Sequence, residues 1–222
     1  KMLQMLGTGA SFPEIIINIF LIGLALIIVM PVHEFAHAFT AYKLGDTSQL
    51  TQGRLTLNPL KHLDPFGAVC ILLTGFGWAK PVYINGSLLK KGGKFANSFV
   101  ALAGPFSNVL LAIIFAFLYR LIGRLFDVSA GFGSVVELFV IVVFMISINL
   151  AIFNLIPVPP LDGFGIINPL LPLKAQMFVR KYQQGFSIVF IILLVTGVLT
   201  TPVVFVSSWL QNLIMEGVSL IL

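Results

Sequence analysis

The feature that most constrains this chain is an apolar stretch without a charged residue, from Ile15 to Met30, that runs directly into an H-E-x-x-H motif. The apolar segment continues to Tyr42, which makes 28 residues, or about 42 Å of helix at 1.5 Å per residue. A bilayer core is about 30 Å thick, and about 20 apolar residues in a helix cross it. The stretch therefore predicts a transmembrane helix that tilts or protrudes.

The composition agrees with a membrane protein. Hydrophobic residues make up 58% and charged residues 9% of the 222 residues, whereas about 25% of a soluble domain is charged. The net charge is +5, and the Lys and Arg residues are scattered through loops. This distribution favours contact with an anionic lipid leaflet over nucleic-acid binding. The first apolar segment is too long for a cleavable signal peptide, and the single cysteine, Cys70, cannot form an internal disulfide.

Further apolar segments follow. Spans are predicted at about residues 96–119, 135–155 and 186–199, and a last segment at 203–222 either spans or lies in the interface. The run at 66–76 is too short to cross and is predicted to be re-entrant or interfacial. We find no repeat, so we expect one all-α polytopic membrane domain over residues 1–222.

Charge asymmetry predicts the orientation. Seven Lys and Arg residues lie between the first two spans, and cytoplasmic loops of membrane proteins are enriched in these residues. This places the 43–94 and 160–184 loops inside and the N-terminus outside. The basic residues of the first loop are Lys43, Arg54, Lys61, Lys80, Lys90, Lys91 and Lys94.

His33, Glu34 and His37 form the H-E-x-x-H motif. On a helix, positions i and i+4 share one face, so the two imidazoles can bind one Zn²⁺ while Glu34 acts as general base toward water. A chance pattern, or polar residues packed between helices, is the alternative. It is disfavoured in lipid, because an ionisable group at mid-bilayer costs about 2.5–3.5 kcal/mol unless something compensates for it.

A catalytic zinc site needs a third protein ligand. Asp162, in NLIPVPPLDG at residues 154–163, is the acid that lies near another span, and the prolines before it leave backbone groups free at membrane depth. A simple turn after the span explains the LDG sequence equally well. His62 lies in a polar loop and is predicted to be a surface or interfacial histidine.

With these motifs, the chain resembles the site-2 protease family of intramembrane zinc metalloproteases. HEFAH at 33–37 is similar to the family's zinc helix, NLIPVPPLDG to its second signature, and AGPFSN at 103–108 to the motif on its central helix. GRLTLNPLKHLDPFG at 53–67 and GWAKPVYIN at 77–85 resemble the compact prokaryotic subgroup without a PDZ domain. The resemblance covers about residues 20–170.

The resemblance implies a three-helix catalytic core at about residues 15–170, followed by C-terminal helices at about 185–222. One zinc would be held by His33, His37 and Asp162, with Glu34 as general base. The substrate would be a transmembrane or signal-type segment, cut within or near the bilayer of a prokaryotic plasma membrane, with the active site toward the cytoplasm.

The family also has a membrane-associated β-hairpin, which the resemblance implies at GWAKPVYIN. A helical substrate must unwind before hydrolysis, and an exposed strand edge can pair with its freed backbone. Tyr83 and Ile84 are therefore candidate substrate-binding residues. Asn108 and Asn154 are candidates for holding the substrate backbone or the oxyanion, and an interhelical hydrogen bond is an equally plausible role for each. Gly104 is expected to permit close helix packing.

Two other classes remain as alternatives. A membrane metal transporter or metal-binding protein would carry ligands along a pathway, and it would not need a glutamate beside a ligand. A CAAX-type membrane metalloprotease would use a glutamate as third ligand, but Glu137 and Glu216 lack that context. A catalytically inactive relative is disfavoured, since each expected catalytic residue type is present.

Overall fold

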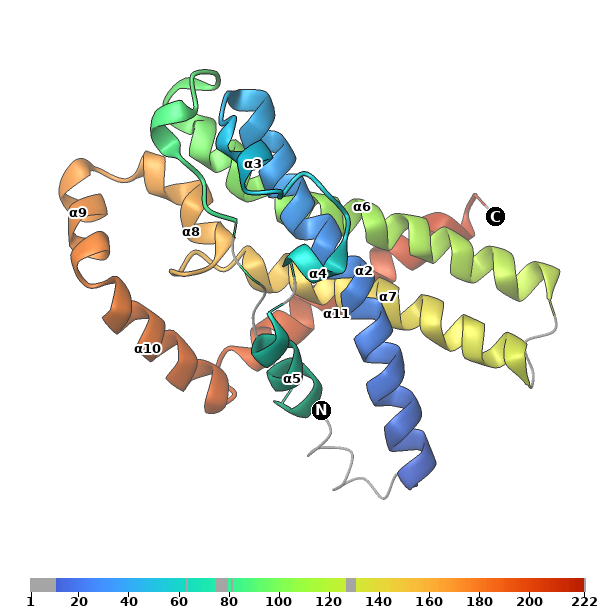
Figure 1. Cartoon of the computed structure of the whole chain (residues 1–222). Helices are drawn as coiled ribbons and strands as arrows, with labels where there is room; N and C mark the ends of the chain where they lie inside the picture. The colour runs from blue at the N-terminus through green and yellow to red at the C-terminus, as the bar shows by residue number, and fades with distance from the viewer. Residues whose placement is uncertain (1–10, 63, 75–79, 81, 127–130, 222) are drawn as a thin grey trace.

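The computed structural model describes residues 11–62, 64–74, 80, 82–126 and 131–221. Regular structure in these ranges is helical, and Figure 1 shows its arrangement. The long helices are α2 (Phe12–Leu44), α6 (Ala96–Leu125), α7 (Phe132–Asn154), α10 (Gln183–Val195) and α11 (Thr200–Ser219). The short ones are α3 (Ser48–Thr51), α4 (Pro59–His62), α5 (Pro65–Thr74), α8 (Asp162–Ile167) and α9 (Leu173–Lys181), with 3₁₀ turns at Gly86–Leu88, Gly93–Phe95 and Asn168–Leu170.

Three helices in the described ranges, α2, α6 and α7, are long and apolar enough to cross a membrane. They confirm the predicted spans at 15–42, 96–119 and 135–155. α9 and α10 meet at a 71° bend and make a fourth span only if the two count as one. The chain is therefore a multi-pass membrane protein, and α5, with 10 residues, is too short to cross, as predicted.

The first span begins and ends with recognisable caps. At its start, the Ser11 N–H donates to the Glu14 carboxylate over 2.9 Å. At its end, Gly45 adopts φ +118°, and a Cβ on this residue would lie 2.8 Å from the Leu88 carbonyl oxygen. Only glycine fits this left-handed, crowded position, so the helix ends at Leu44, two residues beyond the end of the predicted apolar segment at Tyr42.

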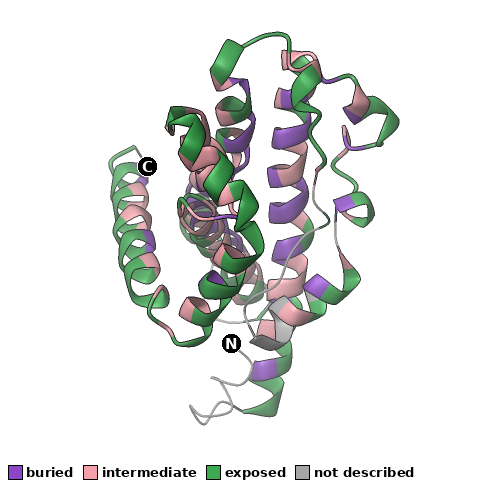
Figure 2. Ribbon diagram, turned by 90° about the vertical axis from the view of Figure 1, so that its left-hand side faces the viewer, coloured by how far each residue is buried: buried purple, intermediate pink, exposed green. Residues whose placement is uncertain are grey.

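The core lies where α6 packs against both α7 and α2. Small residues such as Ala25, Ala112 and Ala116 are fully buried there and bring the helices close, while Phe144 and Ile148 fill the space between α6, α7 and α11. In Figure 2 the C-terminal helix is mostly exposed on its outer side. Its exposed side chains include Val204, Phe205 and Trp209, and a lipid-facing surface requires apolar side chains of this kind.

Two of the spans contain a buried proline. Pro31 lies inside α2, two residues before His33, and Pro105 lies inside α6, directly after Gly104. Proline has no N–H, so each interrupts the helical hydrogen-bond ladder at that level.

The predicted β-hairpin at 77–85 is not supported. Residues 75–79 and 81 lie outside the described ranges, and Lys80 and residues 82–85 form no strand. The segment uses side-chain partners instead. The Tyr83 carbonyl accepts hydrogen bonds of 2.9 Å from Gln49 and from Gln52, and the Asn85 N–H donates to Asp46 over 2.9 Å.

The loop between α2 and α5 is more ordered than its polar sequence suggests. Asp46 is fully buried, and its carboxylate accepts hydrogen bonds from Ser48, Gln49 and Asn85. Burial alone would raise the pKa of Asp46, but the hydrogen bonds from Ser48, Asn85 and Gln49 outweigh it and hold that pKa below its usual value.

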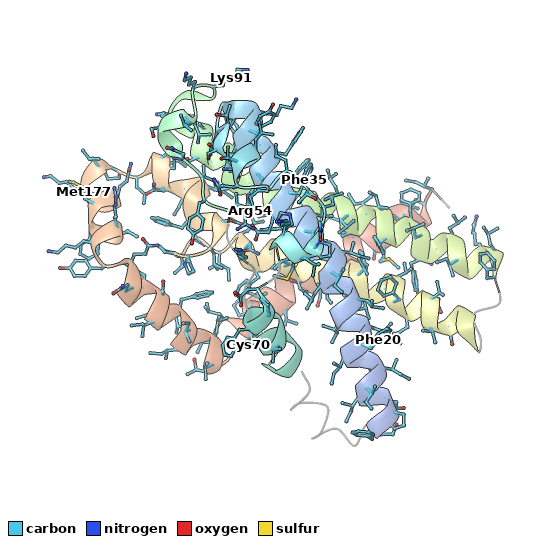
Figure 3. The ribbon with its side chains drawn as sticks, viewed as in Figure 1. Phe20, Phe35, Arg54, Cys70, Lys91 and Met177 are labelled. Carbon is cyan, nitrogen blue, oxygen red and sulfur yellow. The ribbon has the colours of Figure 1, made fainter. Side chains whose placement is uncertain are left out.

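Arg54 and His62 are also buried in this loop, so the prediction of a surface or interfacial His62 is wrong. His62 shares a 2.7 Å hydrogen bond with the Thr56 carbonyl, and Arg54, labelled in Figure 3, donates to the carbonyl of Lys61 in α4 over 2.6 Å. The Lys80 N–H donates to the His62 carbonyl. The physical reason is that buried backbone carbonyls in a folded loop need hydrogen-bond partners. The side chains of Arg54 and His62 are buried because they bond the carbonyls of Lys61 and Thr56.

Candidate metal centre

The metal centre begins on α2, which carries both motif histidines on one face. His33 and His37 are each 5% exposed, and their Nε2 atoms lie 3.0 Å apart. The helical spacing of four residues places them one turn apart. Glu34, between them in sequence, is half-buried on the same helix.

Asp162 approaches from the start of α8. Its Oδ2 lies 3.1 Å from Nε2 of His33 and 3.3 Å from Nε2 of His37. The chain folds back tightly there, since a Cβ on Gly163 would lie 2.5 Å from the Ile156 carbonyl oxygen. Glycine after the aspartate thus lets the turn press against the end of α7 and direct the carboxylate toward α2.

These three side chains suit a metal ion. Their ligand atoms all lie within 4.8 Å of one another, and Asp162 Oδ2 is buried without a hydrogen-bond partner in the described part of the chain. Two imidazole nitrogens and one carboxylate oxygen match the donor set of catalytic zinc, which leaves a fourth position open. His33, His37 and Asp162 are therefore positioned as a zinc site.

The second nitrogen of His37 is held by backbone. Its Nδ1 lies 2.7 Å from the carbonyl oxygen of Val100 on α6. A carbonyl only accepts, so Nδ1 carries the proton and Nε2 keeps its lone pair for a metal. No side-chain pattern in the sequence marks Val100, because the contact uses its main chain.

The second nitrogen of His33 is held by a side chain. Nδ1 of His33 lies 3.0 Å from Nδ2 of Asn108, which is fully buried on α6. The interhelical hydrogen bond that the sequence left open for Asn108 is thus present. Oδ1 of the same amide is buried without a partner among the described residues.

Gly104 faces the imidazoles directly. A Cβ at this position would lie 2.6 Å from Cε1 of His33 and would overlap Nε2 of His37. The expected close packing is confirmed, and its closest neighbours are the two imidazole rings. Any side chain here would occupy the space between α6 and the metal-facing nitrogens.

The other predicted residues lie elsewhere. Asn154 donates to the Leu150 carbonyl of its own helix over 2.9 Å. Tyr83 and Ile84 are 71% and 38% exposed, and the hydrogen bonds of Tyr83 lead to the loop after α2. The substrate-binding roles of these residues and of Asn108 stay predictions, and so does the general-base role of Glu34.

Known proteins are similar to this chain in sequence. A sequence profile described as Peptidase family M50 matches residues 123–197. A Bacillus subtilis protein named "Putative zinc metalloprotease YwhC" is 44% identical over 174 residues, which cover 78% of this chain and 79% of that protein.

More distant relatives carry similar names. The Rip2 protein of Mycolicibacterium smegmatis, named as a zinc metalloprotease in the same terms, is 33% identical over 75% of this chain and 63% of its own length. The MJ0611 protein of Methanocaldococcus jannaschii, named likewise, is 32% identical over 72% of this chain and 78% of its own. No solved structure matches the chain significantly.

Proposed function

Because the chain belongs to peptidase family M50, the site-2 protease family, we propose that it is an intramembrane zinc metalloprotease that hydrolyses peptide bonds within or near transmembrane segments of other proteins. The observation that carries the proposal is the approach of His33 Nε2, His37 Nε2 and Asp162 Oδ2 within 3.0–3.3 Å, with both histidines on the candidate span α2. His33, His37 and Asp162 would hold the metal. Zinc held there would supply a Lewis acid for the scissile carbonyl and for water.

Glu34 moves the protons of the reaction. Its carboxylate takes a proton from the water that attacks the carbonyl carbon of the scissile bond. The same group then gives that proton to the departing amide nitrogen as the C–N bond breaks, so the products are a carboxylate and an amine. Its place one residue after His33 on α2 supports this role, because it keeps the carboxylate beside the metal-facing nitrogens without making it a ligand.

The substrate has to unwind before water reaches its backbone, and its freed N–H and C=O groups then need partners. Residues 82–85 can provide them. Side chains hold this segment at Tyr83 and Asn85, whereas the main-chain groups of Val82 and Ile84 make no hydrogen bond in the described ranges. Backbone pairing with Val82 and Ile84 would add the substrate as a strand.

A cleft of about 820 Å³ borders this segment. It is lined by Tyr83, Ile84 and Asn85, by Ser48 and Gln52 on the loop after α2, and by Arg180 on α9. These elements belong to the loops that the positive-inside rule assigns to the cytoplasm. We therefore place the substrate entrance and the metal centre toward the cytoplasmic side, with the N-terminus outside.

Metal transport is a weaker explanation. A transporter needs donor groups distributed along a path, and the described residues contain one cluster of metal-binding type, with a glutamate beside it.

The test is cleavage of a transmembrane substrate by purified protein in proteoliposomes, with zinc content measured on the same samples. Asp162→Ala should lose zinc and cleavage together. Glu34→Gln should keep zinc and lose about 10²–10⁴-fold in turnover, since a positioned general base contributes that much. Glu137→Ala, which removes a carboxylate from α7 outside the centre, serves as the matched control and should change neither. Full zinc in Asp162→Ala, or near-normal turnover in Glu34→Gln, would contradict the assigned roles.

Orientation needs its own measurement. In a Cys70→Ser background, single cysteines at Lys91 and Lys174 should react with an impermeant thiol reagent only after the cytoplasmic face is opened. A cysteine at Arg124, at the far end of α6, should react from outside. The reverse pattern would overturn the proposed topology.

A further inference from the structure

The side-chain amide of Asn108 is satisfied at one end only. The residue is fully buried, its Nδ2 lies 3.0 Å from Nδ1 of His33, and its Oδ1 has no hydrogen-bond partner in the described part of the chain. Rotating an amide by half a turn exchanges its oxygen and nitrogen, and the two ends have nearly the same shape. The Asn108 amide can therefore present either a donor or an acceptor to His33.

His33 needs both kinds of partner at different times. A neutral imidazole carries one N–H. When Nε2 uses its lone pair for a metal, the proton sits on Nδ1, which then requires an acceptor. When Nε2 carries the proton, it can donate to the lone pair of His37 Nε2 at 3.0 Å, and Nδ1 then requires a donor. Nδ2 of Asn108 serves the second state, and Oδ1 serves the first.

We propose that Asn108 is a positioning residue that fixes the metal-binding tautomer of His33 by turning Oδ1 toward its Nδ1–H. The inference rests on the zinc site of the proposed function but not on any substrate. It differs from the oxyanion or substrate-binding role that the sequence suggests for Asn108, because the amide is already in contact with the imidazole.

The two histidines are therefore held in different ways. The Val100 carbonyl can only accept, so His37 is kept permanently in the tautomer that binds metal. The Asn108 amide can do either, so His33 is the ligand whose tautomer changes when metal enters or leaves. Loss of Asn108 should weaken metal binding without removing a ligand.

The experiment measures the zinc dissociation constant of the purified full chain by competition with a chelator, in the absence of substrate. Asn108→Leu, which keeps the approximate volume but removes the amide, should weaken zinc binding about 10–100-fold, the usual effect of losing a partner behind a metal ligand. Asn108→Asp restores an acceptor for Nδ1–H and should bind zinc at least as tightly as the parent protein. Asn154→Leu is the matched control, because that amide bonds within its own helix, and its zinc affinity should not change.

Parental zinc affinity in Asn108→Leu would overturn the inference, and so would an Asn108→Asp variant as weak as Asn108→Leu. If Asn108→Leu does not fold, Asn108→Ala replaces it with the same expectations. A parent protein that binds zinc but cleaves no transmembrane substrate would contradict the proposed function and leave this inference intact. A chain that cleaves its substrate while Asn108→Leu binds zinc normally would do the reverse.

Discussion

The metal centre and the 82–85 segment are both built from polar contacts, but they are held to different extents. At the metal centre α6 fixes Nδ1 of each imidazole, through Val100 for His37 and through Asn108 for His33. Nε2 of each imidazole faces Asp162. The 82–85 segment is held at Tyr83 and Asn85 and has no partner at Val82 or Ile84 in the described ranges.

This difference separates two requirements of a protease. Groups that act on a reacting bond must be in place before the substrate arrives, because misplacement by about 1 Å costs rate. Groups that receive an unwound chain must instead keep hydrogen-bonding capacity free. The first region should therefore respond to mutation abruptly, and the second gradually.

The largest effect is expected at Gly104. Gly104→Ala introduces a Cβ 2.6 Å from His33 Cε1, so an imidazole has to move and the ligand atoms separate. We expect a loss of zinc affinity and of turnover of about 100-fold or more, as for other defects that misplace reacting groups. Zinc content and cleavage rate are the measurements.

Gly123→Ala is the matched control, because it is the same substitution on the same helix, and among the described residues no side chain or backbone from outside its own turn of helix lies within 4 Å of the new Cβ. It should keep zinc and gain up to about 1 kcal/mol of helix stability. Equal zinc content and cleavage rate in the two variants would contradict the expected abrupt response of the metal centre to mutation.

An intermediate effect is expected at Ile84. Ile84→Pro removes an N–H that has no partner in the described ranges, so the cost falls on substrate pairing. One lost hydrogen bond of about 1 kcal/mol corresponds to about a fivefold fall in kcat/KM. Zinc content should stay at the parental level.

Tyr83→Pro sharpens this experiment. The sequence suggests that Tyr83→Pro also impairs cleavage. The structure predicts the larger effect for Ile84→Pro, because the main-chain groups of Ile84 have no partner in the described ranges. Unchanged kcat/KM in both variants would argue against strand addition at this segment.

The smallest effect is expected from pH at Asp46. Its pKa is held below the usual value by hydrogen bonds from Ser48, Asn85 and Gln49 despite burial. The stability that the carboxylate gives is therefore complete above the unfolded-state pKa of about 3.9 and is lost as pH falls through the lower folded-state pKa.

Limited proteolysis of the 46–62 loop between pH 3 and pH 7 measures this. We expect a loss of protection smaller than about fivefold, because only part of a contact of about 1 kcal/mol is lost in this pH range. Asp46→Asn should be cleaved faster at neutral pH and should show no further change on acidification. The same acid response in Asp46→Asn would assign the effect to another group.

The sequence predicts the metal centre better than its surroundings. His33 and His37 could be paired from helical spacing, and the turn before Asp162 from its prolines. The contacts behind them could not be found in this way. Val100 acts through a carbonyl that every residue possesses, and the contact of Gly104 with the imidazoles depends on how closely α6 approaches α2.

The predictions of a surface or interfacial His62 and of a β-hairpin at 77–85 failed because of contacts within the loop after α2. Asp46, Arg54 and His62 lie between spans, where polar residues usually face solvent, and only the folded loop shows that they satisfy buried backbone groups. The β-branched and aromatic residues of VYI favour a strand, but strand propensity depends on the neighbours that pairing offers. Here Gln49 and Gln52 occupy the Tyr83 carbonyl.

The two buried prolines have a consequence for hydration. Pro31 deprives the Ile27 carbonyl of the N–H that an ordinary helix places four residues later, and Pro105 does the same to the Ala101 carbonyl. In hydrocarbon such an oxygen needs another donor, and an ordered water, a Ser or Thr side chain or a neighbouring helix can supply it. Both prolines stand within two residues of groups that line the metal centre. The backbone of α2 and α6 therefore has carbonyl groups near the metal centre that can bind water without adding another charged side chain to the spans.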